Sequence, residues 1–111
     1  MGIMLITNNP AADGKYSGSV ETVYLAGADL ASVLRKVRDM VHEGHALLTH
    51  PLSGSVKPGQ TCYKSVAVTR EKGALDEESL EIIESSIAVA EKLLEDYRLI
   101  DLDLISGALD K

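Results

Sequence analysis

The sequence contains no tryptophan and no phenylalanine, and its only aromatic residues are four tyrosines. A core must therefore be built from aliphatic side chains, and the chain has few aromatic rings on which nucleic-acid bases could stack. Lysine and arginine number 11 against 17 aspartates and glutamates, which gives a formal net charge of -6. Because this charge repels polyanions, we expect no nucleic-acid partner.

Cysteine is nearly absent as well, since Cys62 is the only one in 111 residues. A single cysteine excludes an intramolecular disulfide, and with it the disulfide-stapled scaffold of small secreted proteins. No apolar run is long enough to cross a bilayer, and the first residues lack the basic segment of a signal peptide. We therefore expect a cytoplasmic protein that does not enter a membrane.

What the sequence does contain is typical of one folded domain spanning residues 1–111. A hydrophobic fraction of 45% with 25% charged residues is well above the apolar content of a disordered chain. Short apolar or β-branched segments bounded by turn residues predict strands. The predicted strands are residues 3–7, 20–25, 46–49 and 63–69.

Two amphipathic patterns predict helices, one between Asp29 and Gly44 and one beginning at Asp76. The segment 10–19, between the first two strands, is predicted to be a loop. The fold class that we predict is α/β, with a small mixed, mainly parallel sheet of about four strands and two main helices. The order of elements would be strand-strand-helix, twice.

The end of the chain, 98–111, fits two kinds of secondary structure. Apolar residues from 100 to 104 alternate with aspartates as in a strand, whereas Leu102, Ile105 and Leu109 have the spacing of a helix. Either form would expose apolar side chains that need to be covered. We therefore interpret 98–111 as a docking tail that packs on the domain, on a second copy in a homodimer or on another protein.

The candidate ligand site is predicted at the carboxyl edge of the sheet. The strand-helix-strand unit from 20 to 49 is expected to be a crossover between parallel strands. If the first strand is parallel to them, the turns after the first and third strands leave the sheet at the edge where open α/β sheets bind ligands. The predicted ligand-binding residues are Asn8, Asn9, Thr49, His50, Ser53, Gly54, Ser55 and Lys57.

The loop from His50 to Lys57 carries the chemistry of this candidate site. Its hydroxyls, its ammonium and the backbone amides that glycine leaves accessible suit a small anion such as a carboxylate or a phosphate. The loop lacks the Gly-Lys-Ser/Thr sequence of a P-loop. The same composition also fits a plain surface connection made of turn-forming residues. Both interpretations stay open at this point.

The sequence contains three histidines, a residue type common in catalytic and metal sites. Imidazole is a common general acid or base, so His50 keeps a small enzyme open as an alternative, although it can equally end a strand by bonding a backbone carbonyl. His42 and His45 are three residues apart, but Gly44 interrupts the helix on which they would share a metal. Cys62 has no second cysteine near it. We expect no metal and no cofactor, and whether the protein is an enzyme stays open.

The segment 37–58 (VRDMVHEGHALLTHPLSGSVKP) resembles the GrdX family, small proteins encoded beside glycine reductase components in amino-acid-fermenting anaerobes. The similarity runs from Thr7-Asn8-Asn9-Pro10 through Tyr63-Lys64-Ser65 into the glutamate-rich helix. This resemblance implies a glycine reductase context, and a glycine reductase component as a partner, without assigning an activity to particular residues.

Taken together, these features predict an accessory or regulatory domain that binds a small anionic metabolite. Two alternatives remain. One is a small enzyme that uses His50 as acid or base, and the other is a protein-interaction module that acts through the tail 98–111.

Overall fold

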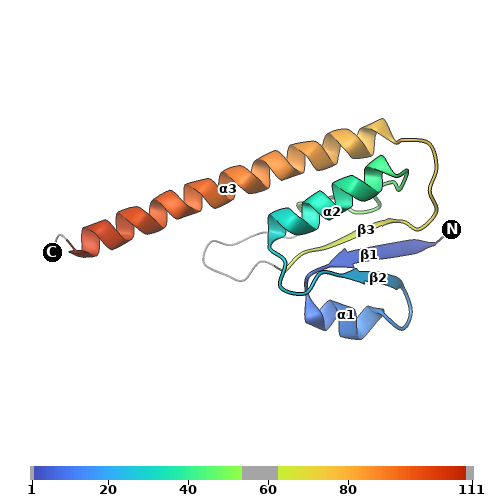
Figure 1. The fold of residues 1–111 in the computed structure, drawn as a ribbon, viewed down its shortest axis with the longest axis horizontal. Coiled ribbons are helices and arrows are strands. Elements are labelled where there is room, and N and C mark those ends of the chain that lie inside the picture. Colours follow the sequence, from blue (N-terminus) through green and yellow to red (C-terminus); the bar gives the residue numbers. More distant parts are fainter. Residues whose placement is uncertain (1, 54–62, 110–111) are drawn as a thin grey trace.

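The structure of the protein is a computed structural model that describes residues 2–53 and 63–109. These residues form an α/β fold with a three-stranded mixed sheet and three helices (Figure 1). In chain order the elements are β1 (Ile3–Thr7), α1 (Pro10–Tyr16), β2 (Glu21–Tyr24), α2 (Leu30–His42), β3 (Ser65–Thr69) and α3 (Glu77–Leu109).

The sheet has the strand order β2-β1-β3. Strands β1 and β2 are parallel, with Met4 opposite Glu21 and Thr7 opposite Tyr24. Strands β1 and β3 are antiparallel, so that Thr7 also lies opposite Ser65, the first residue of β3. The ends of β1 and β2 and the beginning of β3 therefore share one edge of the sheet, which we call the carboxyl edge. The opposite edge, where β1 and β2 begin, is the amino edge.

Three of the predicted strands are confirmed as β1, β2 and β3, but the strand predicted at 46–49 is wrong. This segment forms an isolated antiparallel bridge, Leu47 with Val68, rather than a ladder. The backbone N–H groups of Leu48 and Thr49 both bond the carbonyl oxygen of Ala67, at 2.8 and 3.3 Å. Because two successive residues share one acceptor, no regular ladder forms with β3. The sheet thus has three strands with one parallel and one antiparallel pair, rather than about four that are mainly parallel.

A short helix, α1, occupies most of segment 10–19, where the sequence predicts a loop. Asn9 is its N-cap, because its side-chain oxygen accepts a hydrogen bond from the backbone N–H of Ala11 at 3.0 Å. Pro10 follows in the first turn, where its missing N–H costs nothing. The order of elements is therefore strand-helix three times, rather than strand-strand-helix twice.

Helix α2 is confirmed where the sequence predicts it. The side chain of Asp29 caps its N-terminus by accepting a hydrogen bond from the N–H of Ser32 at 2.8 Å, and Gly44 follows its end with a φ of 112°. Its apolar face packs on the inner face of the sheet and on α3. The core residues that it contributes are Leu30, Ala31, Val33, Leu34, Val37, Met40 and Val41, and the sheet and α3 add Met4, Ile6, Val66, Val68, Ile83, Ile87 and Ala90.

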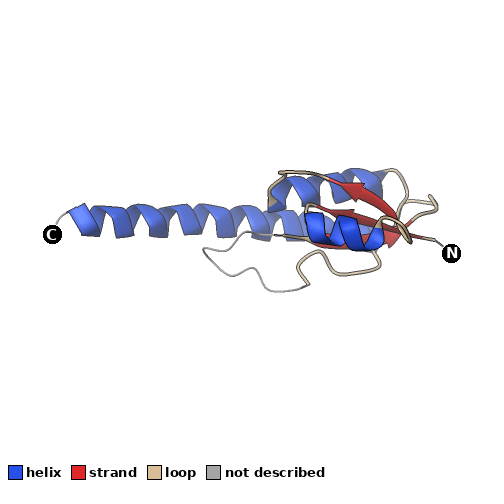
Figure 2. Cartoon of the chain, turned by 90° about the horizontal axis from the view of Figure 1, so that it is seen from below, coloured by secondary structure: helices blue, strands red, loops and turns tan. Residues whose placement is uncertain are grey.

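Helix α3 is one continuous element of 33 residues, about 50 Å long at the usual rise of an α-helix. The helix predicted after Asp76 is confirmed, and the tail from residue 98 to Leu109 is helical rather than a strand. Its first turns pack beside α2, and both views show that it continues past the end of the sheet (Figures 1 and 2). No helix within the described residues is long and apolar enough to span a membrane.

Candidate functional site

The two turns that the sequence placed at the candidate site lie at the same edge of the sheet. Asn8 follows the end of β1, and its backbone N–H bonds the carbonyl of Lys64 at 3.3 Å. The Nζ of Lys64 in turn donates to the backbone carbonyl of Ser53, in the turn after Thr49. Lys64 therefore joins the two turns at the carboxyl edge.

The side chain of Asn8 holds three segments together. Its Nδ2 donates to the carbonyl of Ala28 at 2.8 Å, and its Oδ1 accepts from the backbone N–H of Lys64 at 2.8 Å. Only 4% of the residue is exposed. The amide of Asn8 thus serves the structure, because it fixes the end of β1 against the turn before α2 and the start of β3.

Asn9 and Thr7 form a second set of contacts at the same edge. Besides capping α1 through its side chain, Asn9 donates its backbone N–H to the hydroxyl of Thr7 at 3.0 Å. That hydroxyl also shares a hydrogen bond of 2.7 Å with the hydroxyl of Ser65. These contacts position the turn after β1, and a contact of Asn8 or Asn9 with a ligand stays a prediction.

The mid-chain turn is held by its own side chains. The hydroxyl of Thr49 accepts a hydrogen bond from the N–H of Ala67 at 3.0 Å, which continues the contact with β3. His50 is exposed, and its Nδ1 accepts from the N–H of Leu52 at 3.1 Å. Since an N–H must point at a lone pair, the neutral ring carries its proton on Nε2. The N–H of Ser53 bonds the carbonyl of His50 at 3.0 Å and completes the turn.

Three of the predicted ligand-binding residues, Gly54, Ser55 and Lys57, lie outside the described residues, as does Cys62. Through the bonds of Lys64 to Asn8 and Ser53, the structure joins the turn that contains Asn8 and Asn9 to the turn that follows Thr49 and His50. Their role as ligand-binding residues stays a prediction.

Lys64 is the residue at this edge that we did not predict. Only 5% of it is exposed, and burial lowers the pKa of its amino group by removing the charged form from water. The sequence does contain a signal for this position. In the β3 segment, Lys64 has the same alternation as Val66 and Val68, which face the core. A lysine in phase with buried valines indicates a buried ammonium.

The N-terminus of α2 reaches the same edge. Asp29 caps it, and hydrogen bonds from the hydroxyl and the backbone N–H of Ser32 lower the pKa of the Asp29 carboxyl. The preceding turn contains Gly27, with a φ of 72°. The carboxyl edge thus combines a buried ammonium, a helix N-terminus and an exposed imidazole, a combination suited to holding a small anion.

The described residues contain no cluster of side chains suited to a metal ion. Over residues 2–53 and 63–109, no group of three or more histidine, cysteine, aspartate or glutamate side chains is placed to hold an ion. His42 ends α2, while His45 is buried beyond the turn at Gly44.

Comparison with known families identifies the chain over nearly its full length. A family model described as GrdX-like protein matches residues 4–110. No curated protein and no solved structure matches the chain. The resemblance seen in the segment 37–58 is thereby confirmed, and it extends to the helical tail.

Proposed function

We propose that this chain, which belongs to the GrdX-like protein family, is an accessory or regulatory domain that binds a small anionic metabolite at the carboxyl edge. The observation that supports this proposal most is the buried ammonium of Lys64. The proposed ligands are carboxylates and phosphates of metabolite size.

A buried ammonium is costly unless an anion or several hydrogen bonds compensate it. Among the described residues, no carboxylate forms an ion pair with Lys64, and its Nζ bonds the carbonyl of Ser53. An ammonium has three N–H donors, so two remain for a ligand. A bound anion would both accept these donors and compensate the buried charge.

The loop that follows Ser53 supplies the rest of the proposed site. His50 lies at its start, and the predicted contacts of Gly54, Ser55 and Lys57 would add backbone amides, a hydroxyl and a second ammonium. From the family we further propose that the domain acts in the cytoplasm beside glycine reductase, with a component of that system as its partner.

The experiment is an NMR titration of the full chain with acetate, phosphate and glycine. We expect saturable shifts of the backbone amide signals of Asn8, Ser53 and Lys64. The variant Lys64→Met should lose them, whereas the control Lys15→Met, at an exposed site on α1, should keep them. The absence of any saturable shift, or an unchanged affinity in a folded Lys64→Met variant, would contradict the proposal.

A second function, protein interaction through the tail 98–111, is supported by one observation, the continuation of α3 past the end of the sheet (Figure 1). The enzyme alternative has less support, since no carboxylate of the described residues bonds His50.

A further inference from the structure

A second concave site lies at the amino edge, away from the carboxyl edge and Lys64. It is a cavity of about 380 Å³ between α2 and the paired strands β1 and β2, at the lower end of the usual range for metabolite pockets. We infer that this cavity binds a small carboxylate that carries a hydroxyl or amino group next to its carboxyl group. This inference uses residues of a different site and does not rest on the proposed function.

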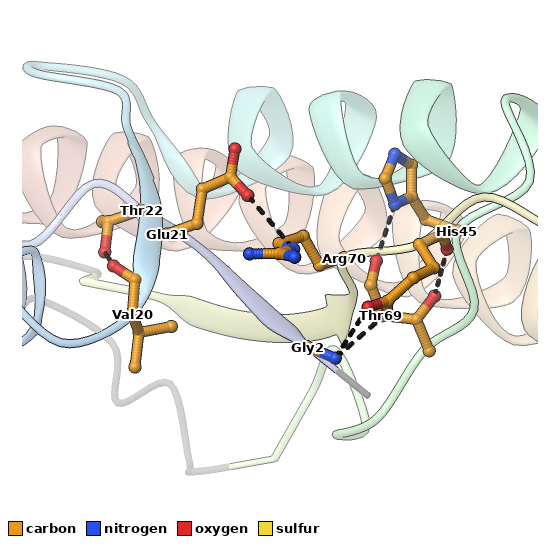
Figure 3. A network of polar contacts seen from close by, with 8 residues as sticks. Gly2, Val20, Glu21, Thr22, His45, Thr69 and Arg70 are labelled. Carbon is orange, nitrogen blue, oxygen red and sulfur yellow. Dashed lines mark hydrogen bonds and ion pairs between the residues drawn. The ribbon is translucent and has the colours of Figure 1, made fainter.

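His45 supplies the hydrogen-bond acceptor of this site. The residue is 3% exposed, and its Nδ1 lies 2.6 Å from the carbonyl oxygen of Thr69 (Figure 3). A carbonyl oxygen can only accept, so Nδ1 carries the proton and the neutral ring has its lone pair on Nε2.

The Nε2 of His45 is left for a ligand. Figure 3 shows it on the side of the ring away from Thr69, and the imidazole lines the cavity. No residue in the described part of the chain forms a hydrogen bond with Nε2. A ligand O–H or N–H inside the cavity would satisfy this lone pair.

Lysine and arginine side chains outnumber the carboxylates around the cavity. Arg70 lies 4.0 Å from Glu21, and Lys72 lies 3.3 Å from Glu43, at exposed positions where such pairs are weak (Figure 3 shows the first). Lys36 also lines the cavity and forms no ion pair with a described residue. An unpaired lysine beside a cavity is notable in a chain with a net charge of -6. We therefore assign Lys36 as the cation that binds the carboxylate of the ligand.

The remaining wall is apolar. Met4 comes from β1, Val23 from β2 and Met40 from α2. Lys36 and Met40 are four residues apart on α2, so that both project from one face of the helix toward the sheet. Methionine side chains adapt to the shape of a guest. The apolar wall is suited to a short hydrocarbon body, between the carboxylate at Lys36 and the donor group at His45.

The test uses three probes of equal carbon number: lactate, alanine and propionate. They share a carboxylate and differ in bearing a hydroxyl, an ammonium or neither. The readout is the ¹⁵N shift of the His45 ring in the full chain. We expect lactate or alanine to shift the Nε2 signal saturably, and propionate to bind at least about tenfold more weakly, because it has no donor for the Nε2 lone pair, which is open to the cavity.

The matched variants are Lys36→Met and Lys15→Met. Loss of the charged hydrogen bond in Lys36→Met should weaken binding about tenfold or more, while Lys15→Met should bind as the wild type does. If alanine binds more tightly than lactate, the inference is supported, and Glu21 or Glu43, which line the cavity, is indicated as the partner of the alanine ammonium. No saturable shift at His45, equal binding of propionate, or unchanged affinity in Lys36→Met would each overturn the inference. These outcomes are separate from the proposed function, whose readout lies at Asn8, Ser53 and Lys64.

Discussion

The side-chain oxygen of Asn8 accepts a hydrogen bond of 2.8 Å from the backbone N–H of Lys64, a residue 56 positions later in the chain. Through this bond the end of β1 and the start of β3 are held together, and the ammonium of Lys64 is placed above the turn that contains Ser53. The same amide fixes the turn before α2 through the carbonyl of Ala28. One buried side chain thus organises the carboxyl edge.

The first prediction concerns this amide. The variant Asn8→Ala leaves the N–H of Lys64 and the carbonyl of Ala28 without their partner, at a site closed to water. We expect a loss of about 2 to 4 kcal/mol in the free energy of unfolding, measured by urea denaturation. The neighbouring Asn9→Ala removes a helix cap at a more exposed site and should cost about 1 kcal/mol. Equal losses in the two variants would contradict the role assigned to Asn8.

The second prediction concerns pH and Lys64. Burial lowers the pKa of this lysine in the folded chain, so the unfolded chain binds more protons between the folded value and the ordinary value of about 10.4. Stability should therefore rise with pH across that window, and the rise should be smaller in Lys64→Met. Affinity for an anion at this edge should fall over the same window as the ammonium deprotonates. Urea denaturation and binding titrations at a series of pH values would measure both.

The third prediction concerns the cap of α2. Because hydrogen bonds from Ser32 lower the pKa of Asp29 in the folded chain, its contribution to stability is complete above the ordinary pKa of aspartate. It is lost as pH falls through the lowered value. At neutral pH, Asp29→Ala should cost about 1 kcal/mol.

Asp39, which is exposed in the same helix, provides the control for this variant. Its closest cation is Arg38 at 3.8 Å, and Asp39→Ala should change the stability by no more than about 0.5 kcal/mol. If both alanine variants are equally stable at neutral pH, Asp29 does not act as a cap.

The fourth prediction concerns the turn after α2. A Cβ added at Gly44 would lie 2.3 Å from the carbonyl oxygen of Gly73, and the φ of 112° is unfavourable for any other residue. Neither the clash with the backbone of Gly73 nor the positive φ can be relieved by a side-chain movement. Gly44→Ala should therefore lower the free energy of unfolding by about 3 kcal/mol or more. At Gly27, whose φ is 72°, a Cβ would meet nothing within 4 Å, so Gly27→Ala should cost only about 1 to 2 kcal/mol. Thermal unfolding of the two variants, measured side by side, checks the difference.

The fifth prediction concerns the helical tail. If residues 98–111 carry self-association, the intact chain should have twice its formula mass of 11.9 kDa by light scattering, and a chain that ends at Tyr97 should have the mass of one copy. If the intact chain has the mass of one copy, the homodimer hypothesis is wrong.

The elements that could be predicted from the sequence are those with local signals. Asp29 before an apolar stripe, and Gly44 after it, bound α2 within a residue or two. The sequence Asn9-Pro10 is an equally local signal for α1, but the glycine at position 14 and the polar residues around it obscured it. Nothing local distinguishes segment 46–49 from a strand, because its pairing is limited by two N–H groups that converge on the carbonyl of Ala67.

The sequence predicts that the turns at Asn8 and Ser53 meet at one edge of the sheet, and they do, but it did not lead us to Lys64, which joins them. The parallel strand at 46–49, from which the alignment of the two turns was inferred, does not form. The bonds of Lys64 to Asn8 and to Ser53 hold the two turns at one edge instead. The burial of Lys64 follows from the alternation of β3, in which Lys64, Val66 and Val68 face the core. The cavity at the amino edge could not be found in this way, since Glu21, Lys36, His45 and Arg70 come from four separate parts of the chain and meet only in the folded state.

The length of α3 affects how the size of this protein should be measured. The radius of gyration is 16.2 Å, whereas a spherical chain of this length would have about 13 Å. A rod projecting from a small body increases the hydrodynamic radius, so a single copy would elute from a gel-filtration column ahead of globular standards of its mass. Calibration against such standards would overestimate the mass of a single copy, and the number of subunits must come from a method that does not depend on shape.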